Sequence, residues 1–148
     1  LASLSGSEDR TKKREEPKER LLRSGRILLT EDNLLNQEIA TAILEEAGFQ
    51  IEVADNGAAA VEMLRRSEPG YYQLVLMDIQ MPVMNGYQAT EAIRALEDPV
   101  LSAIPVVAMT ANAFEEDKQE ALRHGMNGHI AKPIDVNVLF STLDGMLG

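Results

Sequence analysis

Residues 74–78 read LVLMD, and this short stretch decides the fold class. Four consecutive apolar residues with no polar alternation are typical of a strand that is buried on both faces of a parallel sheet. The stretch ends on an aspartate, so we expect Asp78 at the carboxyl end of that strand. Working outward along the chain, the same arrangement recurs: an apolar run that stops at polar residues.

Four more apolar runs accompany the first: Ile27–Leu29, Phe49–Val53, Ile104–Met109 and His129–Ala131. The run at 49–53 alternates, which indicates an edge strand. Amphipathic stretches that suit helices lie between and after the runs, at residues 35–47, 57–64, 89–96, 113–124 and 136–147. In the first of these, Leu35, Ile39 and Ile43 share one face, with Ala40 and Leu44 beside it. The alternation predicts an α/β fold of five βα units, (βα)5, a three-layer sandwich with helices on both faces of the sheet.

Charge divides the chain of 148 residues into two parts. Residues 1–26 hold eight basic and five acidic side chains, which leaves six basic and 19 acidic in residues 27–148. We expect residues 1–25 to be a charged, disordered linker or tail, and residues 26–148 to form one domain. An acidic domain repels phosphate and anionic lipid, so we expect no nucleic-acid partner and no membrane contact by this domain.

Cysteine is absent, which excludes disulfides, thiolate chemistry and Cys-ligated metal. No apolar run approaches the roughly 20 residues of a membrane span, and the charged N-terminus is unlike a signal peptide. These features favour a cytoplasmic location.

The residues that end the apolar runs suggest a site. Glu31 and Asp32 follow the first run, Asp78 ends the third, Thr110 follows the fourth and Lys132 follows the fifth. Each alone has an ordinary structural role, as a turn former, a helix cap or a surface lysine. Together, at the carboxyl edge of an open α/β sheet, three carboxylates repel one another unless a cation is present. Oxygen ligands of this kind suit Mg²⁺, an aspartate can become an aspartyl phosphate, and Lys132 and Thr110 can bind phosphoryl oxygens.

Five motifs carry a family resemblance: ILLTEDN at 27–33, MDIQMP at 77–82, NG at 85–86, MTA at 109–111 and AKP at 131–133. In this order and spacing, they resemble the receiver domain of two-component response regulators over residues 26–148. The stretches at 33–37 and 126–130 are most similar to receivers of hybrid sensor histidine kinases or to single-domain receivers in phosphorelays. The resemblance implies a flavodoxin-like parallel sheet in the order 2-1-3-4-5.

The resemblance also implies a function, which is to accept a phosphoryl group onto Asp78 from a phosphohistidine. The donor would be a histidine kinase or a histidine phosphotransfer domain. Mg²⁺ would be the cofactor, bound by Glu31, Asp32, Asp78 and the backbone carbonyl of Gln80. Phosphorylation would then change the conformation and control an output, with at most weak self-phosphorylation and autodephosphorylation rather than enzymatic turnover.

Further roles follow from the same resemblance. Thr110, Ala111, Lys132 and His129 would bind the phosphoryl group or switch, although the switch position usually carries Tyr or Phe. Pro133 would follow a cis peptide bond, and Pro82 and Gly86 would be structural. The surface of residues 113–124, 129–131 and 136–147 would change between two states and is a candidate homodimer face.

Other functions are weighed against this one. A pseudo-receiver would use the same fold only as a protein-docking module, independently of phosphorylation, and such domains usually lack one of the acidic or lysine residues present here. A phosphatase or dehalogenase would need a second acid where this chain has Gln80. A flavin carrier would need a neutral phosphate loop where Glu31 and Asp32 stand. The sequence leaves open whether the parent chain is a hybrid histidine kinase or a single-domain regulator.

Overall fold

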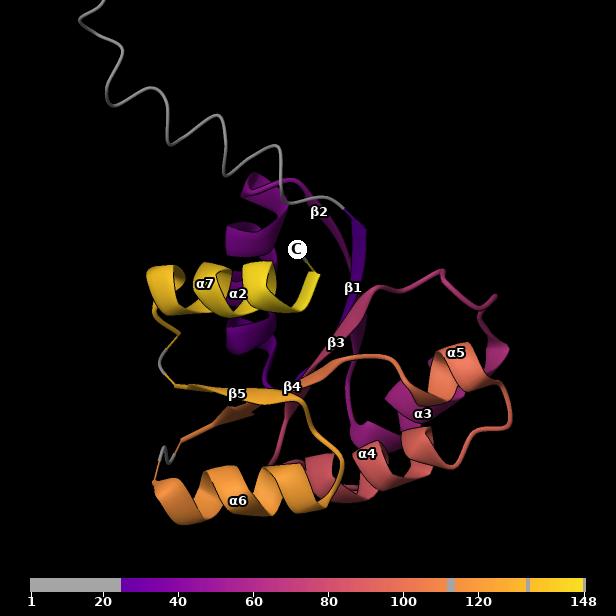
Figure 1. The fold of residues 1–148 in the computed structure, drawn as a ribbon. Coiled ribbons are helices and arrows are strands. Elements are labelled where there is room, and N and C mark those ends of the chain that lie inside the picture. Colours follow the sequence, from indigo (N-terminus) through magenta and orange to yellow (C-terminus); the bar gives the residue numbers. More distant parts are fainter. Residues whose placement is uncertain (1–24, 112–113, 133, 148) are drawn as a thin grey trace, which may run out of the picture.

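The fold is an α/β structure in which strands and helices alternate (Figure 1). The computed structural model describes residues 25–111, 114–132 and 134–147. The strands are β1 (Gly25–Thr30), β2 (Phe49–Ala54), β3 (Leu74–Asp78), β4 (Val106–Thr110) and β5 (Gly128–Ala131). The helices are α2 (Leu34–Glu46), α3 (Gly57–Arg66), α4 (Gly86–Arg94), α5 (Pro99–Ser102), α6 (Glu115–Arg123) and α7 (Val136–Leu147). The predicted tail, apart from Gly25, lies outside the described residues.

The five strands form one parallel sheet in the order β2-β1-β3-β4-β5, which confirms the expected topology. Every residue of β3 and β4 is buried, whereas β2 lies at the edge and is partly exposed. The register pairs Thr30 with Met77, Asp78 with Met109 and Thr110 with Ala131. The carboxyl ends of the four strands β1, β3, β4 and β5 therefore meet at one edge of the sheet.

Two hydrophobic cores lie on opposite faces of the sheet. Figure 1 shows the helices that cover them, α2 and α7 on one face and α3, α4 and α6 on the other. Successive strand residues alternate between them, as the pleat requires: Leu76 belongs to the core under α2 and α7, and Met77 to the core under α3, α4 and α6. The strand residues facing both cores are apolar in β1, β3 and β4, which explains why these three sequence runs show no alternation. Burial on both faces holds the strand ends, and hence the side chains that follow them, in fixed positions.

The ends of the helices follow local capping signals. Asn33, Asn56 and Asn85 each accept a hydrogen bond at the start of α2, α3 and α4, and Asp135 does so for α7. Gly48, which follows α2, has a φ of 113°, in the left-handed region that glycine adopts without strain. In the described residues, no helix is long and apolar enough to cross a membrane.

Two features of the helices could not be taken from the sequence pattern. The exposed fractions of Leu35 and Ile39 are 64% and 46%, and the buried side chains of α2 are instead Gln37, Ala40 and Leu44. The short helix α5 was not predicted, since its four residues are too few to show a period; Asp98 caps it and Pro99 begins it.

Candidate functional site

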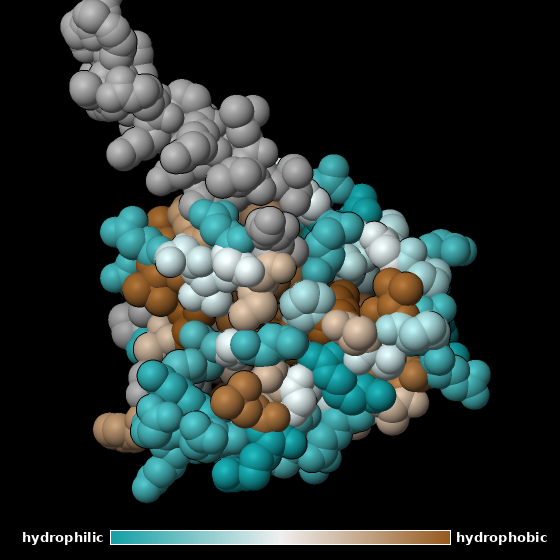
Figure 2. Space-filling view, in the orientation of Figure 1, coloured by the Kyte–Doolittle hydropathy of each residue, from teal (hydrophilic) through white to brown (hydrophobic). Residues whose placement is uncertain are grey.

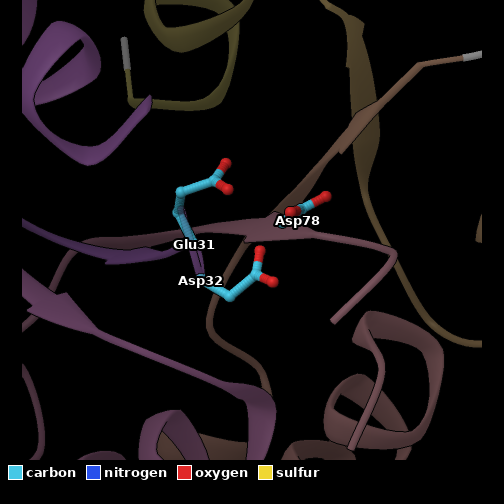
Figure 3. Close-up of side chains that lie close together, drawn as sticks. All are labelled: Glu31, Asp32 and Asp78. Carbon is cyan, nitrogen blue, oxygen red and sulfur yellow. The ribbon is translucent and has the colours of Figure 1, made fainter. Parts of the chain in front are cut away.

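Three carboxylates meet at the carboxyl edge of the sheet. Glu31 and Asp32 follow β1, and Asp78 is the last residue of β3. One carboxylate oxygen from each lies within 4.8 Å of the other two. Figure 3 shows the three side chains turned toward a common space. The structure thus brings together the acidic residues that the sequence singled out.

The site is only partly open to water. The exposed fractions of Glu31 and Asp78 are 2% and 4%, whereas Asp32 is exposed. Lys132, after β5, lies 3.2 Å from Asp78 Oδ1 and 3.3 Å from Glu31 Oε1, measured from its Nζ. Lys132 is therefore not an ordinary surface lysine, because its ammonium bridges two buried carboxylates.

Burial and charge act on the two central groups in opposite ways. Burial and, to a smaller extent, the nearby Glu31 carboxylate raise the pKa of Asp78 from its ordinary 3.8 to about 6, although Lys132 acts to lower it. Burial lowers the pKa of Lys132, but Asp78 and Glu31 raise it by more, so its net pKa lies above the usual value. The lysine stays protonated at neutral pH, and Asp78 is a carboxylate that lacks full compensation for its charge.

A cavity of about 220 Å³ opens over these groups. Its lining includes Thr110 and Ala111 at the end of β4, and Gln80 two residues after Asp78. Thr110 is buried and its carbonyl accepts a hydrogen bond from the Lys132 backbone N–H at 2.8 Å. The cavity brings carboxylates, a hydroxyl residue and an ammonium together around a volume that a small tetrahedral anion can enter.

His129 lies in a different environment. It is half-buried on β5, opposite Ala108. Burial lowers its pKa, as does Lys118, whereas Asp117 and Glu115 raise it. These three charged residues belong to α6, so His129 is placed between the sheet and that helix. Pro133, with its expected cis peptide bond, lies outside the described residues.

The loop between β3 and α4 packs closely behind Asp78. A Cβ atom on Gly86 would come within 2.5 Å of the Asp78 carbonyl oxygen, so this position requires glycine for space. Gly86 is not among the glycines with positive φ, and its role is thus close packing rather than a left-handed turn. Pro82 contributes a carbonyl that accepts from the Met84 N–H at 2.7 Å, which tightens the same loop.

Sequence reasoning missed the residues that hold Glu31. The Asn33 N–H donates to Glu31 Oε2 at 3.2 Å, and the Gln37 amide donates to the Glu31 carbonyl oxygen at 2.6 Å. An amide within an amphipathic helix gives no signal of its own. The available clue was its spacing. Gln37 lies three residues before Ala40 and seven before Leu44, which places all three on the same face of the helix.

Oxygen donors on three side chains fit a hard divalent cation. Mg²⁺ keeps several of its waters and takes few protein ligands, which suits a site that has two buried carboxylates and one exposed carboxylate. Soft ligands are absent from the group, which consists of Glu31, Asp32 and Asp78. The donor set therefore fits Mg²⁺ on its chemistry.

Exposed apolar side chains lie on α2, the helix that follows Glu31 and Asp32, and one of them reaches the site. Leu34, Leu35 and Ile39 on the outer face of α2 are 71%, 64% and 46% exposed. A recess of about 150 Å³ joins Ile39 to Lys132 and Glu31. In the view of Figure 2, by contrast, hydrophobic residues form separate small groups among hydrophilic ones. Apolar surface next to a charged site is typical of a protein-binding area.

Comparison with known proteins gives a consistent result. Residues 27–144 match the family model described as the response regulator receiver domain. The chain is 44% identical over 118 residues to hybrid signal transduction histidine kinase B of Dictyostelium discoideum, covering 74% of this chain and 6% of that protein. It is 38% identical over 122 residues to the peroxide stress-activated histidine kinase mak1 of Schizosaccharomyces pombe, covering 82% and 7%. The chain thus spans a small part of these relatives.

Solved structures resemble the fold over most of the chain. One is the receiver domain of a sensor histidine kinase from Pseudomonas aeruginosa, with a magnesium ion coordinated in its active site cleft. It has a TM-score of 0.75 and 37% identity, and the match covers 84% of this chain and 98% of that one. Another is the co-crystal of the Saccharomyces cerevisiae histidine phosphotransfer protein Ypd1 with the receiver domain of Ssk1. Its TM-score is 0.76 at 28% identity, with 84% and 90% covered.

Proposed function

The chain belongs to the response regulator receiver domain family of two-component phosphorelay signalling, and from that premise we propose that Asp78 accepts a phosphoryl group from a phosphohistidine. The observation that carries the proposal is the contact of Asp78 with both a lysine and a second carboxylate. An ammonium 3.2 Å from the nucleophile can stabilise phosphoryl charge, and the acidic pair can hold a cation. A receiver domain is a signalling switch, so no turnover is required of this arrangement.

In the proposed step, an Asp78 carboxylate oxygen bonds to phosphorus while the bond from phosphorus to the donor imidazole nitrogen breaks. Lys132 already lies beside Asp78 and can pair with a phosphoryl oxygen, and Thr110 can donate a hydrogen bond to another. Glu31, Asp32, Asp78 and the Gln80 carbonyl would hold Mg²⁺. When bound, this ion neutralises charge on the acidic site and on the incoming phosphoryl group.

Intact mass spectrometry tests this function. The protein is incubated with acetyl phosphate, with and without Mg²⁺. We expect a Mg²⁺-dependent gain of one phosphoryl group that is absent in Asp78→Asn and that decays slowly by autodephosphorylation. Glu97→Gln, a change in an exposed carboxylate of the loop after α4, is the control and should still be labelled. Labelling of Asp78→Asn would contradict the choice of acceptor, and a folded protein that is never labelled would favour a phosphorylation-independent docking module.

The donor that we propose is a histidine phosphotransfer domain or a histidine kinase, docked on the apolar face of Leu34, Leu35 and Ile39. Support comes from the position of this face beside the site, and from the similar receiver that crystallises with Ypd1. Small donors need no such surface. Leu35→Ser and Ile39→Ser should therefore slow transfer from phosphorylated Ypd1 but leave labelling by acetyl phosphate unchanged.

A control substitution elsewhere makes this test specific. Leu122 on α6 is 55% exposed, so Leu122→Ser removes a comparable apolar side chain from a different surface. Equal loss of transfer in all three variants would contradict docking on α2.

A further inference from the structure

Gln37 is a buried polar side chain in a position that would normally hold an apolar one. It is the fourth residue of α2 and shares the sheet-facing side of the helix with Ala40 and Leu44. Only 9% of its surface is exposed. An amide buried there is costly unless its hydrogen bonds are made, so its contacts explain its presence.

Both contacts of the Gln37 Nε2 are with loops at the carboxyl edge of the sheet. It donates to the Glu31 carbonyl oxygen at 2.6 Å and to Asp55 Oδ1 at 3.0 Å. Asp55 follows β2, and the preceding residue, Ala54, accepts a hydrogen bond from the Glu31 N–H at 3.1 Å. The Glu31 backbone is thus fixed to the end of β2 twice, once directly and once through Gln37.

This fixation matters because of the directions of two neighbouring side chains. Successive residues of a strand point to opposite faces. Glu31 and Asp32 are successive, yet oxygens of both lie within 4.8 Å of Asp78. The chain must therefore leave strand geometry immediately after Thr30, where β1 ends. The carbonyl that Gln37 holds belongs to the peptide that joins Glu31 to Asp32, the unit whose orientation sets both directions.

We propose that Gln37 is a positioning residue for the divalent cation site: its amide holds the peptide between Glu31 and Asp32 so that both carboxylates face the ion before it binds. The inference rests on the proposed role of Glu31, Asp32 and Asp78 as cation ligands. Removing a group that hydrogen-bonds to a metal-binding residue and orients it typically lowers metal affinity about 10- to 100-fold.

Calorimetric titration of the metal-free protein with MgCl₂ tests the inference. Gln37→Met preserves length and removes the donor, and it should raise the Kd for Mg²⁺ about tenfold or more. Gln37→Ala is the second variant, since alanine is a good helix former that keeps α2 intact. Ile43→Ala is the matched control, because it removes packing from the same helix while the amide stays in place. We expect it to lower thermal stability but to leave the Kd for Mg²⁺ unchanged.

The outcomes separate this inference from the proposed function. A Kd for Mg²⁺ within twofold of wild type in folded Gln37→Met or Gln37→Ala would overturn the positioning role. An equal rise in Ile43→Ala would also overturn it, since the effect would then be general loosening of α2. Wild-type protein that binds Mg²⁺ but gains no phosphoryl group would contradict the proposed function. The Mg²⁺ affinities of the Gln37 variants would still test the positioning role in that case. Absence of Mg²⁺ binding in the wild type would overturn both.

Discussion

Asp78 is buried beside the Glu31 carboxylate and the Lys132 ammonium. The ammonium does not offset the combined effect of burial and the carboxylate on the pKa of Asp78. Its pKa is raised to about 6 by burial first and by Glu31 second, despite Lys132 at 3.2 Å. The folded state therefore binds a proton more readily than the unfolded state does. Between about pH 4 and pH 6 the metal-free protein loses stability as the pH rises, and above pH 6 the full cost is present.

Asp78→Asn should remove this cost. The change of pKa from 3.8 to about 6 corresponds to at most about 3 kcal/mol, and we expect a gain of about 1–2 kcal/mol in the free energy of unfolding above pH 7. Below pH 4 the variant and the wild type should be equally stable. Urea unfolding in the presence of EDTA measures both. A gain that does not depend on pH would show that the electrostatic explanation is wrong.

Val83 carries backbone strain in the loop after β3. Its φ is 71°, in the left-handed region that β-branched residues avoid, and its side chain is 84% exposed, so no packing requires valine. Val83→Asn should raise the free energy of unfolding by about 0.5–1 kcal/mol, because asparagine tolerates this conformation. Val138→Asn, at an exposed position in α7, is the control and should give no gain. Thermal unfolding of the two variants side by side distinguishes relief of strain from a general effect of polarity.

Some residues of the site could be predicted from the sequence, and others could not. Glu31, Asp32, Asp78 and Lys132 were predicted to converge because parallel strands end at one edge, and the structure shows them together. Gln37 could not be predicted, since its two acceptors belong to loops whose paths depend on the whole sheet. Local sequence patterns predict where a strand ends. The side-chain hydrogen bonds that hold the residues after the strand depend on how distant segments pack together.

At the scale of elements, α4 and α6 are joined by a cluster around His124. Its ring stacks on Tyr87 of α4 with centroids 4.4 Å apart. Nδ1 lies 2.5 Å from Glu91 of α4, and Nε2 lies 2.9 Å from Glu120 of α6. Glu120 also pairs with Arg123. These carboxylates raise the pKa of His124, so the contact between the two helices is strongest when the ring is protonated.

The pH dependence of this contact has a definite sign. Because the folded pKa of His124 is raised, its contribution is complete below about pH 6 and is lost as the pH rises through the folded pKa. The difference in stability between wild type and His124→Gln should therefore shrink from pH 5.5 to pH 8.5. His129→Gln is the opposite control: burial lowers the pKa of His129, so that difference should grow over the same range. Urea unfolding at pH 5.5 and pH 8.5 measures these differences. If the difference between His124→Gln and the wild type were the same at both pH values, the proposed role of the protonated ring would be wrong.

Helix α2 shows why elements are predicted better than their faces. Its position was expected from its period and from Gly48, and the helix forms there. Its apolar stripe does not mark the buried face, because Leu35 and Ile39 are exposed and the neighbouring Ala40 and Leu44 are buried. Hydrophobic periodicity assumes that the apolar stripe faces the core, and it fails where a helix also presents apolar side chains beside a site.

At the scale of the whole molecule, the two ends of the parallel strands differ in the contacts they make. The carboxyl edge of the sheet, where the strands end, holds charged groups around a cavity. The amino edge, where the strands begin, is held together by hydrogen bonds. Arg94, at the end of α4, provides the main link at the amino edge: it donates to the carbonyls of Ser102, Ile104 and Gly125 and to Asn127 Oδ1, at 2.7–3.0 Å. Asn127 Oδ1 also accepts from the Val106 N–H at 2.9 Å. One guanidinium thus joins the segments that lead into β4 and β5.

Nothing in the sequence marked Arg94, which lies on an amphipathic helix where arginine is ordinary. The sheet order was implied by the family resemblance, and the alternation of strands and helices was visible directly. The amino-edge contacts were not, because they bring together residues 94, 102, 104, 125 and 127, whose proximity exists only after β4 and β5 have paired.

Replacing Arg94 should therefore cost stability without damaging the site. Arg94→Met removes the donors and leaves several half-buried acceptors without their partner, for which we expect a loss of about 2–4 kcal/mol in the free energy of unfolding. Arg94→Lys should recover only part of this, since one ammonium cannot reach all four acceptors in the plane that the guanidinium occupies. Under conditions in which both variants stay folded, labelling by acetyl phosphate should match the wild type, because the cavity lies at the other edge of the sheet. Urea unfolding with intact mass measurement tests both statements, and lost labelling in folded Arg94→Met would mean that the two edges are coupled.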